Sequence, residues 1–191
     1  MEFSPAGKMD LSSQVAAVVK PIPFKGIDEF FDISGLLANP QLFKRVIETL
    51  SSRIKSLNPD FICALDARGF LIGAPVSLEL GIPLVMLRKK GKLPGECFST
   101  VFDKEYEAGD ILEVQCGAIP SGSTIVIVDD VLATGGSMKG AYSLVRRFAP
   151  KRVIGACLMD LGLPMSADLK NHGLEVFSLF DVREWKNLAI A

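Results

Sequence analysis

The segment Ile125–Ser137, with the sequence IVIVDDVLATGGS, decides how this chain folds. Its first four residues are apolar, a pattern typical of a strand buried on both faces of a parallel sheet. Two neighbouring carboxylates, Asp129 and Asp130, follow the strand, and a glycine-rich turn then leads into a helix. Because open α/β sheets bind ligands at the carboxyl ends of their strands, we expect a ligand site at this position.

The turn after the two carboxylates has the composition of a phosphate site. Its glycines let the backbone approach a ligand closely, and its amides and hydroxyls lie beside the positive end of the next helix. Adjacent carboxylates can accept hydrogen bonds from a vicinal diol, so Asp129 and Asp130 are expected to bind a ribose. Together these features predict a site for a 5-phosphorylated ribose. The expected phosphate-binding residues are Ala133, Thr134, Gly135, Gly136 and Ser137.

Two other nucleotide-binding patterns are absent from the sequence. No GxxxxGK[ST] string occurs, and no GxGxxG string follows a predicted strand. A P-loop for ATP hydrolysis and a dinucleotide-binding turn are therefore excluded. A surface turn with incidental acids and glycines would explain Asp129 and Asp130 alone, but not the whole string up to Ser137.

The rest of the chain alternates helical patterns with short apolar runs, which implies right-handed crossovers and a parallel sheet. Pro21, Pro23 and Gly26 predict an ordered loop over residues 21–34, and residues 91–118 interrupt the alternation as a flexible loop with a β-hairpin. Helices are expected at about 10–20, 40–57, 70–80 and 137–148, and strands at 61–65, 83–87, 124–128, 152–159 and 175–180.

Size and composition indicate one globular domain over residues 1–191. The chain is 49% hydrophobic and 23% charged, which excludes a disordered protein. Its net charge of −1 argues against a nucleic-acid partner held by a bulk positive field. No secretion signal and no run of 18 apolar residues occurs, so we expect a cytoplasmic protein without a membrane partner.

Cysteine and histidine usage excludes two further classes of site. His172 is the single histidine, and no CxxC pair occurs, so the patterns of a zinc site and of a thioredoxin-type site are both missing. Unpaired cysteines agree with a reducing compartment. The four cysteines are Cys63, Cys97, Cys116 and Cys157.

The string VIVDDVLATGGS resembles the phosphoribosyl pyrophosphate signature of type I phosphoribosyltransferases. Three other stretches narrow the resemblance to the adenine phosphoribosyltransferase family, and it extends from about Pro23 to Phe180. It implies an α/β fold with a parallel-sheet core, helices on both faces, a small N-terminal base-binding hood over about residues 1–40, and the flexible loop and hairpin. The three stretches are ARGF at 67–70, RKKGKLPGE at 88–96 and EY at 105–106.

The RKKGKLPGE stretch places four cations within five residues of a nearly neutral protein. Such a run is often a solvated face, but its place after a predicted strand favours neutralisation of a pyrophosphate. The resemblance also implies a pyrophosphate loop at residues 66–68, with a cis peptide bond that does not involve proline. The expected pyrophosphate-binding residues are Ala67, Arg68, Arg88, Lys89 and Lys92.

The resemblance further implies how base and catalysis are served. Glu105 corresponds to the family's acid/base group beside the purine, and Tyr106 would help to close a lid. The base-binding residues would be Glu29, Phe30 and Val131. Phe31 replaces the arginine of the family's GIxFRDI pattern, which leaves the choice of purine open.

The implied reaction joins adenine N9 to ribose C1 of phosphoribosyl pyrophosphate and yields AMP and pyrophosphate in purine salvage. Mg²⁺ would be the cofactor, held mainly through the substrate, with Asp129 and Asp130 as its candidate protein ligands. A homodimer is expected, in which the arginine matching Arg88 reaches the neighbour's site. Two alternatives remain: a transferase for hypoxanthine, guanine or xanthine, and a non-catalytic regulator that senses phosphoribosyl pyrophosphate.

Overall fold

The computed structural model describes residues 10–102, 109–164 and 168–188. These residues pack as two compact units, of which unit 1 contains 10–46 and 183–188, and unit 2 contains 47–182. Residues 10–40 of the expected hood fall within unit 1. The organisation of residues 1–191 as one domain stays a prediction.

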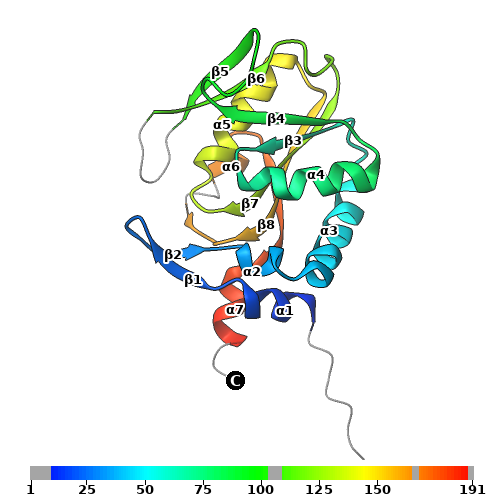
Figure 1. Cartoon of the computed structure of the whole chain (residues 1–191). Helices are drawn as coiled ribbons and strands as arrows, with labels where there is room; N and C mark the ends of the chain where they lie inside the picture. The colour runs from blue at the N-terminus through cyan, green and yellow to red at the C-terminus, as the bar shows by residue number, and fades with distance from the viewer. Residues whose placement is uncertain (1–9, 103–108, 165–167, 189–191) are drawn as a thin grey trace, which may run out of the picture. The chain divides into compact units, whose positions relative to one another are not determined.

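Unit 2 is built on a seven-stranded sheet with the strand order β5-β6-β4-β3-β7-β8-β9 (Figure 1). The five strands from β4 to β9 in this order pair in parallel, whereas β6 pairs antiparallel with both β4 and β5. The predicted α/β fold is thereby confirmed, and the predicted hairpin extends the same sheet. The strands are β3 Phe61–Leu65, β4 Leu84–Lys89, β5 Cys97–Phe102, β6 Asp110–Gln115, β7 Thr124–Leu132, β8 Arg152–Asp160 and β9 Glu175–Asp181.

Helices cover both faces of this sheet, as predicted. A methyl group added at Gly73 of α4 would touch Ile62 and Ala64 of β3, so α4 packs on the face that these two side chains share. Cys63 and Leu65, which alternate with them, belong to the core cluster that includes residues of α5. The helices of unit 2 are α4 Arg68–Leu80, α5 Gly136–Val145, the 3₁₀ turn η1 Arg146–Phe148 and α6 Asp168–Asn171.

Helix α3, Pro40–Lys55, runs from unit 1 into unit 2. The side chain of Asn39 accepts a hydrogen bond from the Leu42 amide at 3.1 Å, so Asn39 caps a helix that has proline at its first position. None of the helices in the described ranges is long and apolar enough to cross a membrane.

Unit 1 contains a two-stranded antiparallel hairpin where an ordered loop was expected, so that prediction is wrong. Lys25 and Gly26 both have positive φ, 50° and 81°, which is the turn geometry that matches the twist of paired strands. Pro21 and Pro23 are tolerated because β1 has a partner on one side within a two-stranded sheet. The elements are α1 Leu11–Val18, β1 Pro21–Phe24, β2 Ile27–Phe31, α2 Ser34–Leu37, the start of α3, and α7 Val182–Leu188.

Two strands continue further than the sequence predicted, because neighbouring strands supply partners for their polar ends. Strand β7 runs on to Leu132, so Asp129 and Val131 are strand residues opposite β8. Strand β4 includes Arg88 and Lys89, which pair with β6. The polar residues at these positions interrupt the apolar run from which the strands were predicted, but the backbone hydrogen bonds between the strands continue through them.

Candidate active site

The carboxyl ends of three neighbouring strands bring most of the predicted site residues of unit 2 to one edge of the sheet. Strand β3 lies between β4 and β7, and all three run in parallel (Figure 1). The segments that leave this edge are therefore adjacent, as expected for a ligand site of an open α/β sheet. They are residues 66–68 after β3, 88–92 at the end of β4, and 129–137 at the end of β7.

Asp129 and Asp130 form a close carboxylate pair on β7. The Asp130 amide donates to Asp129 Oδ1 at 3.0 Å, and Asp130 Oδ2 lies 3.0 Å from Arg68 Nε. Asp130 is only 2% exposed, and its Oδ2 is buried without a hydrogen-bond partner, so the Arg68 contact is an ion pair without hydrogen-bond geometry. The Arg68 guanidinium therefore compensates the charge of this buried oxygen.

The electrostatics of this pair favour retention of a proton. Burial raises the pKa of Asp129 well above its usual range, and the neighbouring Asp130 carboxylate raises it further. Burial also raises the pKa of Asp130, although Arg68 opposes that effect. A vicinal diol or a divalent cation would favour the ionised form of both groups, so the site is suited to such ligands.

Helix α4 begins directly against the end of β7. A methyl group at Gly69 would lie 2.7 Å from the Val128 carbonyl oxygen and 3.2 Å from Asp129 Oδ1, so only glycine fits this position without displacement. The peptide bond between Asp66 and Ala67, just before α4, is cis, as the resemblance implied. The predicted pyrophosphate loop therefore lies beside the predicted ribose acceptors.

Arg88 connects the end of β4 to this loop. Its Nε lies 3.3 Å from Asp66 Oδ2, and its Nη1 donates to the Lys92 carbonyl oxygen at 3.1 Å. The guanidinium also lies over the Phe70 ring, 5.8 Å from the centroid. Asp66 was not predicted to link the two loops, because this contact joins residues 22 positions apart.

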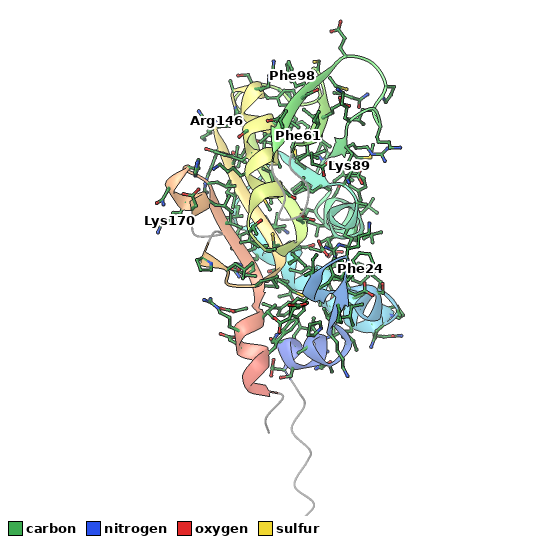
Figure 2. The ribbon with its side chains drawn as sticks, turned by 90° about the vertical axis from the view of Figure 1, so that its left-hand side faces the viewer. Phe24, Phe61, Lys89, Phe98, Arg146 and Lys170 are labelled. Atoms are coloured by element: carbon green, nitrogen blue, oxygen red, sulfur yellow. The ribbon has the colours of Figure 1, made fainter. Side chains whose placement is uncertain are left out.

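Lys89 does not share the surroundings of Arg88. Its Nζ lies 3.6 Å from Asp110 Oδ2 on β6, and its amide donates to Asp66 Oδ2 at 3.4 Å. Figure 2 shows Lys89 and Lys170 on opposite sides of unit 2, as expected for residues of β4 and of α6, which packs on β9. The Lys89 side chain therefore contacts β6, and only its backbone amide contacts the loop at residues 66–68.

The predicted phosphate turn forms the entry to α5. Gly135 caps the helix with a φ of 85°, and the Gly136 amide donates to Thr134 Oγ1 at 3.4 Å. A methyl group at Gly135 would lie 3.1 Å from Leu169, so both the conformation and the packing favour glycine. Ala133 and Ser137 flank this turn, and all five predicted residues are contiguous at the start of the helix.

Comparisons with known proteins agree with this arrangement. Residues 32–175 match the phosphoribosyl transferase domain family. Over 173 residues the chain is 38% identical to an adenine phosphoribosyltransferase of Rhodospirillum centenum, an alignment that covers 91% of this chain and 99% of that protein. The chain belongs to the adenine phosphoribosyltransferase family.

Solved structures of adenine phosphoribosyltransferases share the fold. The Saccharomyces cerevisiae enzyme, in complex with D-2,5-dideoxy-2,5-imino-altritol 1,6-bisphosphate and adenine, is 34% identical with a TM-score of 0.78, over 89% of this chain and 98% of that chain. The Trypanosoma brucei enzyme, in complex with AMP, pyrophosphate and ribose-5-phosphate, is 25% identical with a TM-score of 0.79, over 90% and 79%.

The residues expected to serve the base in an adenine phosphoribosyltransferase are divided between the units. Glu29 and Phe30 lie on β2 of unit 1, and Val131 lies on β7 of unit 2. Phe30 packs against Phe24 across the hairpin, with ring centroids 5.0 Å apart. Glu105 and Tyr106 lie outside the described residues.

Phe31, at the position of the arginine in the adenine phosphoribosyltransferase pattern, is a core residue of unit 1. It is 6% exposed, and its ring lies 6.3 Å from that of Trp185 in an edge-on arrangement. Trp185 in turn donates from Nε1 to Ser12 Oγ at 2.8 Å. An arginine in these surroundings would have to bury its charge.

Proposed function

We propose that this protein is a purine salvage enzyme that transfers the 5-phosphoribosyl group of phosphoribosyl pyrophosphate to adenine, giving AMP and pyrophosphate. The observation that carries this proposal is the meeting of a carboxylate pair, a glycine-rich turn and an arginine-bearing loop at one sheet edge. Adenine, AMP and pyrophosphate occur in complexes of the yeast and trypanosome relatives, which supports the same substrates here.

In the proposed reaction the bond from adenine N9 to ribose C1 forms as the bond from C1 to the pyrophosphate oxygen breaks. Asp129 and Asp130 accept hydrogen bonds from the ribose diol, and the turn at 133–137 holds the 5-phosphate. Arg68 and Arg88, with Lys92, stabilise the charge of the departing pyrophosphate. Glu105 serves as the acid/base group for the purine nitrogens, and Tyr106 excludes water from the developing oxocarbenium ion.

We propose Mg²⁺ as the cofactor of this site. The neighbouring carboxylates of Asp129 and Asp130 are hard oxygen donors of the kind that Mg²⁺ prefers. The described residues contain no group of three or more histidine, cysteine or acidic side chains arranged around a metal, so most ligands would come from substrate oxygens and water. Bound Mg²⁺ would supply neutralisation of the pyrophosphate charge.

The test of this proposal is the choice of purine. With phosphoribosyl pyrophosphate and Mg²⁺, we expect kcat/KM for adenine to exceed that for hypoxanthine, guanine and xanthine by about 100-fold or more. Protein groups that form hydrogen bonds with adenine would be left without partners when a 6-oxopurine is bound. Product formation is measured by chromatography of the nucleotides. Equal or faster turnover of a 6-oxopurine would refute adenine as the substrate, and binding without turnover would favour the regulator.

We propose a homodimer as the working assembly. Leu71 and Leu78 of α4 and Met86 of β4 are 46%, 84% and 43% exposed, and such apolar surface is suited to a subunit contact.

The proposed location of the enzyme is the cytoplasm. The four cysteines are free, which supports a reducing compartment.

A complementation experiment tests whether the dimer shares its sites through Arg88. If Arg88 serves the neighbour's site, as the resemblance implies, mixing inactive Arg88→Ala and Asp129→Asn chains should restore about a quarter of the wild-type activity, because half of the dimers are mixed and each has one intact site. If Arg88 serves its own chain, where it lies beside Asp66, mixing should restore none. Light scattering and subunit exchange by tagged chains serve as controls. A monomer, or no recovery after verified exchange, would leave Arg88 acting in its own chain beside Asp66.

A further inference from the structure

Glu113 is a buried carboxylate on β6 that the proposed reaction does not use. It is 9% exposed, and its side chain lies on the face of β6 opposite to Leu112 and Val114, which belong to the apolar core. Its Oε2 accepts a hydrogen bond from the Gly91 amide at 2.8 Å, and its Oε1 accepts one from Ser99 Oγ at 3.4 Å. A buried carboxylate destabilises a fold unless polar partners compensate it, and the Gly91 amide and the Ser99 hydroxyl are such partners of Glu113. We therefore asked what these contacts hold in place.

The strand pairing places Glu113 beside the predicted pyrophosphate residues. In the antiparallel register of β4 and β6, Glu113 lies directly opposite Arg88, so the two side chains share one face of the sheet. Gly91 belongs to the turn that follows β4 and has a φ of 74°. The carboxylate therefore reaches past the end of the strand and holds the backbone of the next turn.

The turn around Gly91 also sets the position of the Arg88 side chain. The Lys90 amide donates to the Ile111 carbonyl at 3.1 Å and the Lys92 amide to the Lys89 carbonyl at 3.2 Å, which closes the turn around Gly91. The Lys92 carbonyl then accepts from Arg88 Nη1. The guanidinium is thus held between this carbonyl and Asp66 of the neighbouring loop.

We propose that Glu113 is a positioning residue for pyrophosphate, which acts by holding the Gly91 amide so that Arg88 and Lys92 face the 66–68 loop. This inference rests on the proposed function, because it takes pyrophosphate as the anion at this edge. A through-space role would have the opposite sign, since a negative charge beside these cations weakens anion binding and its removal should strengthen it.

Three substitutions separate the two roles. Glu113→Ala removes the acceptor, and we expect it to raise the KM for phosphoribosyl pyrophosphate and the Kd of pyrophosphate about 10-fold, with the KM for adenine within twofold of wild type. Glu113→Gln keeps an oxygen that can accept from Gly91 and should restore both constants to within threefold. Ser99→Ala, the matched control, removes only the longer contact and should change neither constant by more than twofold.

Gly91→Ala disturbs the same turn independently of Glu113, because an alanine is strained at the positive φ of this position. It should raise the Kd of pyrophosphate as Glu113→Ala does. In the double variant this Kd should be no higher than in the single variant with the higher Kd, because both substitutions disturb the same turn. Calorimetry gives the pyrophosphate Kd, and hydrogen exchange of the Gly91 amide should become about 10-fold faster in Glu113→Ala.

The outcomes distinguish this inference from the proposed function. Active wild-type enzyme with unchanged or tighter pyrophosphate binding in Glu113→Ala would overturn the role of Glu113 alone. A parallel loss of adenine and pyrophosphate binding, or failure of Glu113→Gln to restore it, would also overturn this role. Wild-type protein that neither forms AMP nor binds pyrophosphate would overturn both, because the turn would have no anion to position.

Discussion

Replacement of Asp129 by asparagine should lower kcat/KM for phosphoribosyl pyrophosphate about 100-fold and, at the same time, make the ligand-free protein more stable. The loss arises because a ribose diol meets one amide in place of a carboxylate, and charged acceptors make the stronger hydrogen bonds. The gain arises because the substitution removes one of two neighbouring negative charges while the Oδ1 atom that accepts from the Asp130 amide is kept.

The stability effect has a defined dependence on pH. Because the pKa of Asp129 is raised in the folded state, the wild-type free energy of unfolding falls as pH rises from the ordinary value of 3.8 through the raised value. Asp129→Asn lacks this loss, so its advantage, about 1 kcal/mol, should be present at pH 8 and absent at pH 3.8 or below.

Denaturant unfolding at both ends of this range measures the stability of Asp129→Asn, and titration with phosphoribosyl pyrophosphate measures its binding. Glu79→Gln, which removes an exposed carboxylate of α4, is the control and should change neither quantity. Unchanged affinity for phosphoribosyl pyrophosphate in Asp129→Asn would mean that this carboxylate does not contact the ribose. Lower stability at pH 8 would mean that its charge is favourable in the fold.

Replacement of Glu105 by glutamine should lower kcat by about 10²-fold to 10⁴-fold, the range expected when an acid/base group is lost. Glutamine preserves size and polarity but does not exchange a proton in this pH range, so the KM for phosphoribosyl pyrophosphate should change less than threefold. Steady-state rates with both substrates at saturation give the answer.

Glu107→Gln is the matched control for Glu105→Gln, because Glu107 lies in the same polar segment of the sequence and has no assigned role. It should retain at least half of the wild-type kcat. A kcat of Glu105→Gln within threefold of wild type would remove Glu105 from the mechanism, and an equal loss in both variants would point to an effect of the segment's charge.

The sequence predicted the parallel core well because its strands carry their own signal. The runs at 61–65 and 125–128 are continuously apolar, as strands buried on both faces require. The hairpin of β1 and β2 escaped prediction because Pro21 and Pro23 suggest a loop unless the pairing of β1 is known. Similarly, the ends of β4 and β7 depended on partner strands, which the residues themselves do not reveal.

The same distinction applies to the site. The residues proposed to bind ribose and phosphate stand out in the sequence because they lie in one segment, Ile125–Ser137, where the chemistry and the local structure coincide. The contacts of Asp66 with Arg88 and of Glu113 with Gly91 could not, since each joins residues 22 positions apart and depends on strand register. A polar residue between Leu112 and Val114 was the only signal for Glu113.

The close approach of Gly69 to the end of β7 has a consequence for the ligands that this protein can accept. Because the first turn of α4 is in contact with the Val128 carbonyl and Asp129, the loop proposed to bind pyrophosphate and the carboxylates proposed to bind ribose have no room to move past each other. The distance between the 66–68 loop and the carboxylates of Asp129 and Asp130 is therefore fixed by the packing. An inhibitor with a longer or shorter link between its two anionic ends would have to adapt its own conformation, so rigid linkers of matched length should be the better starting point for inhibitor chemistry.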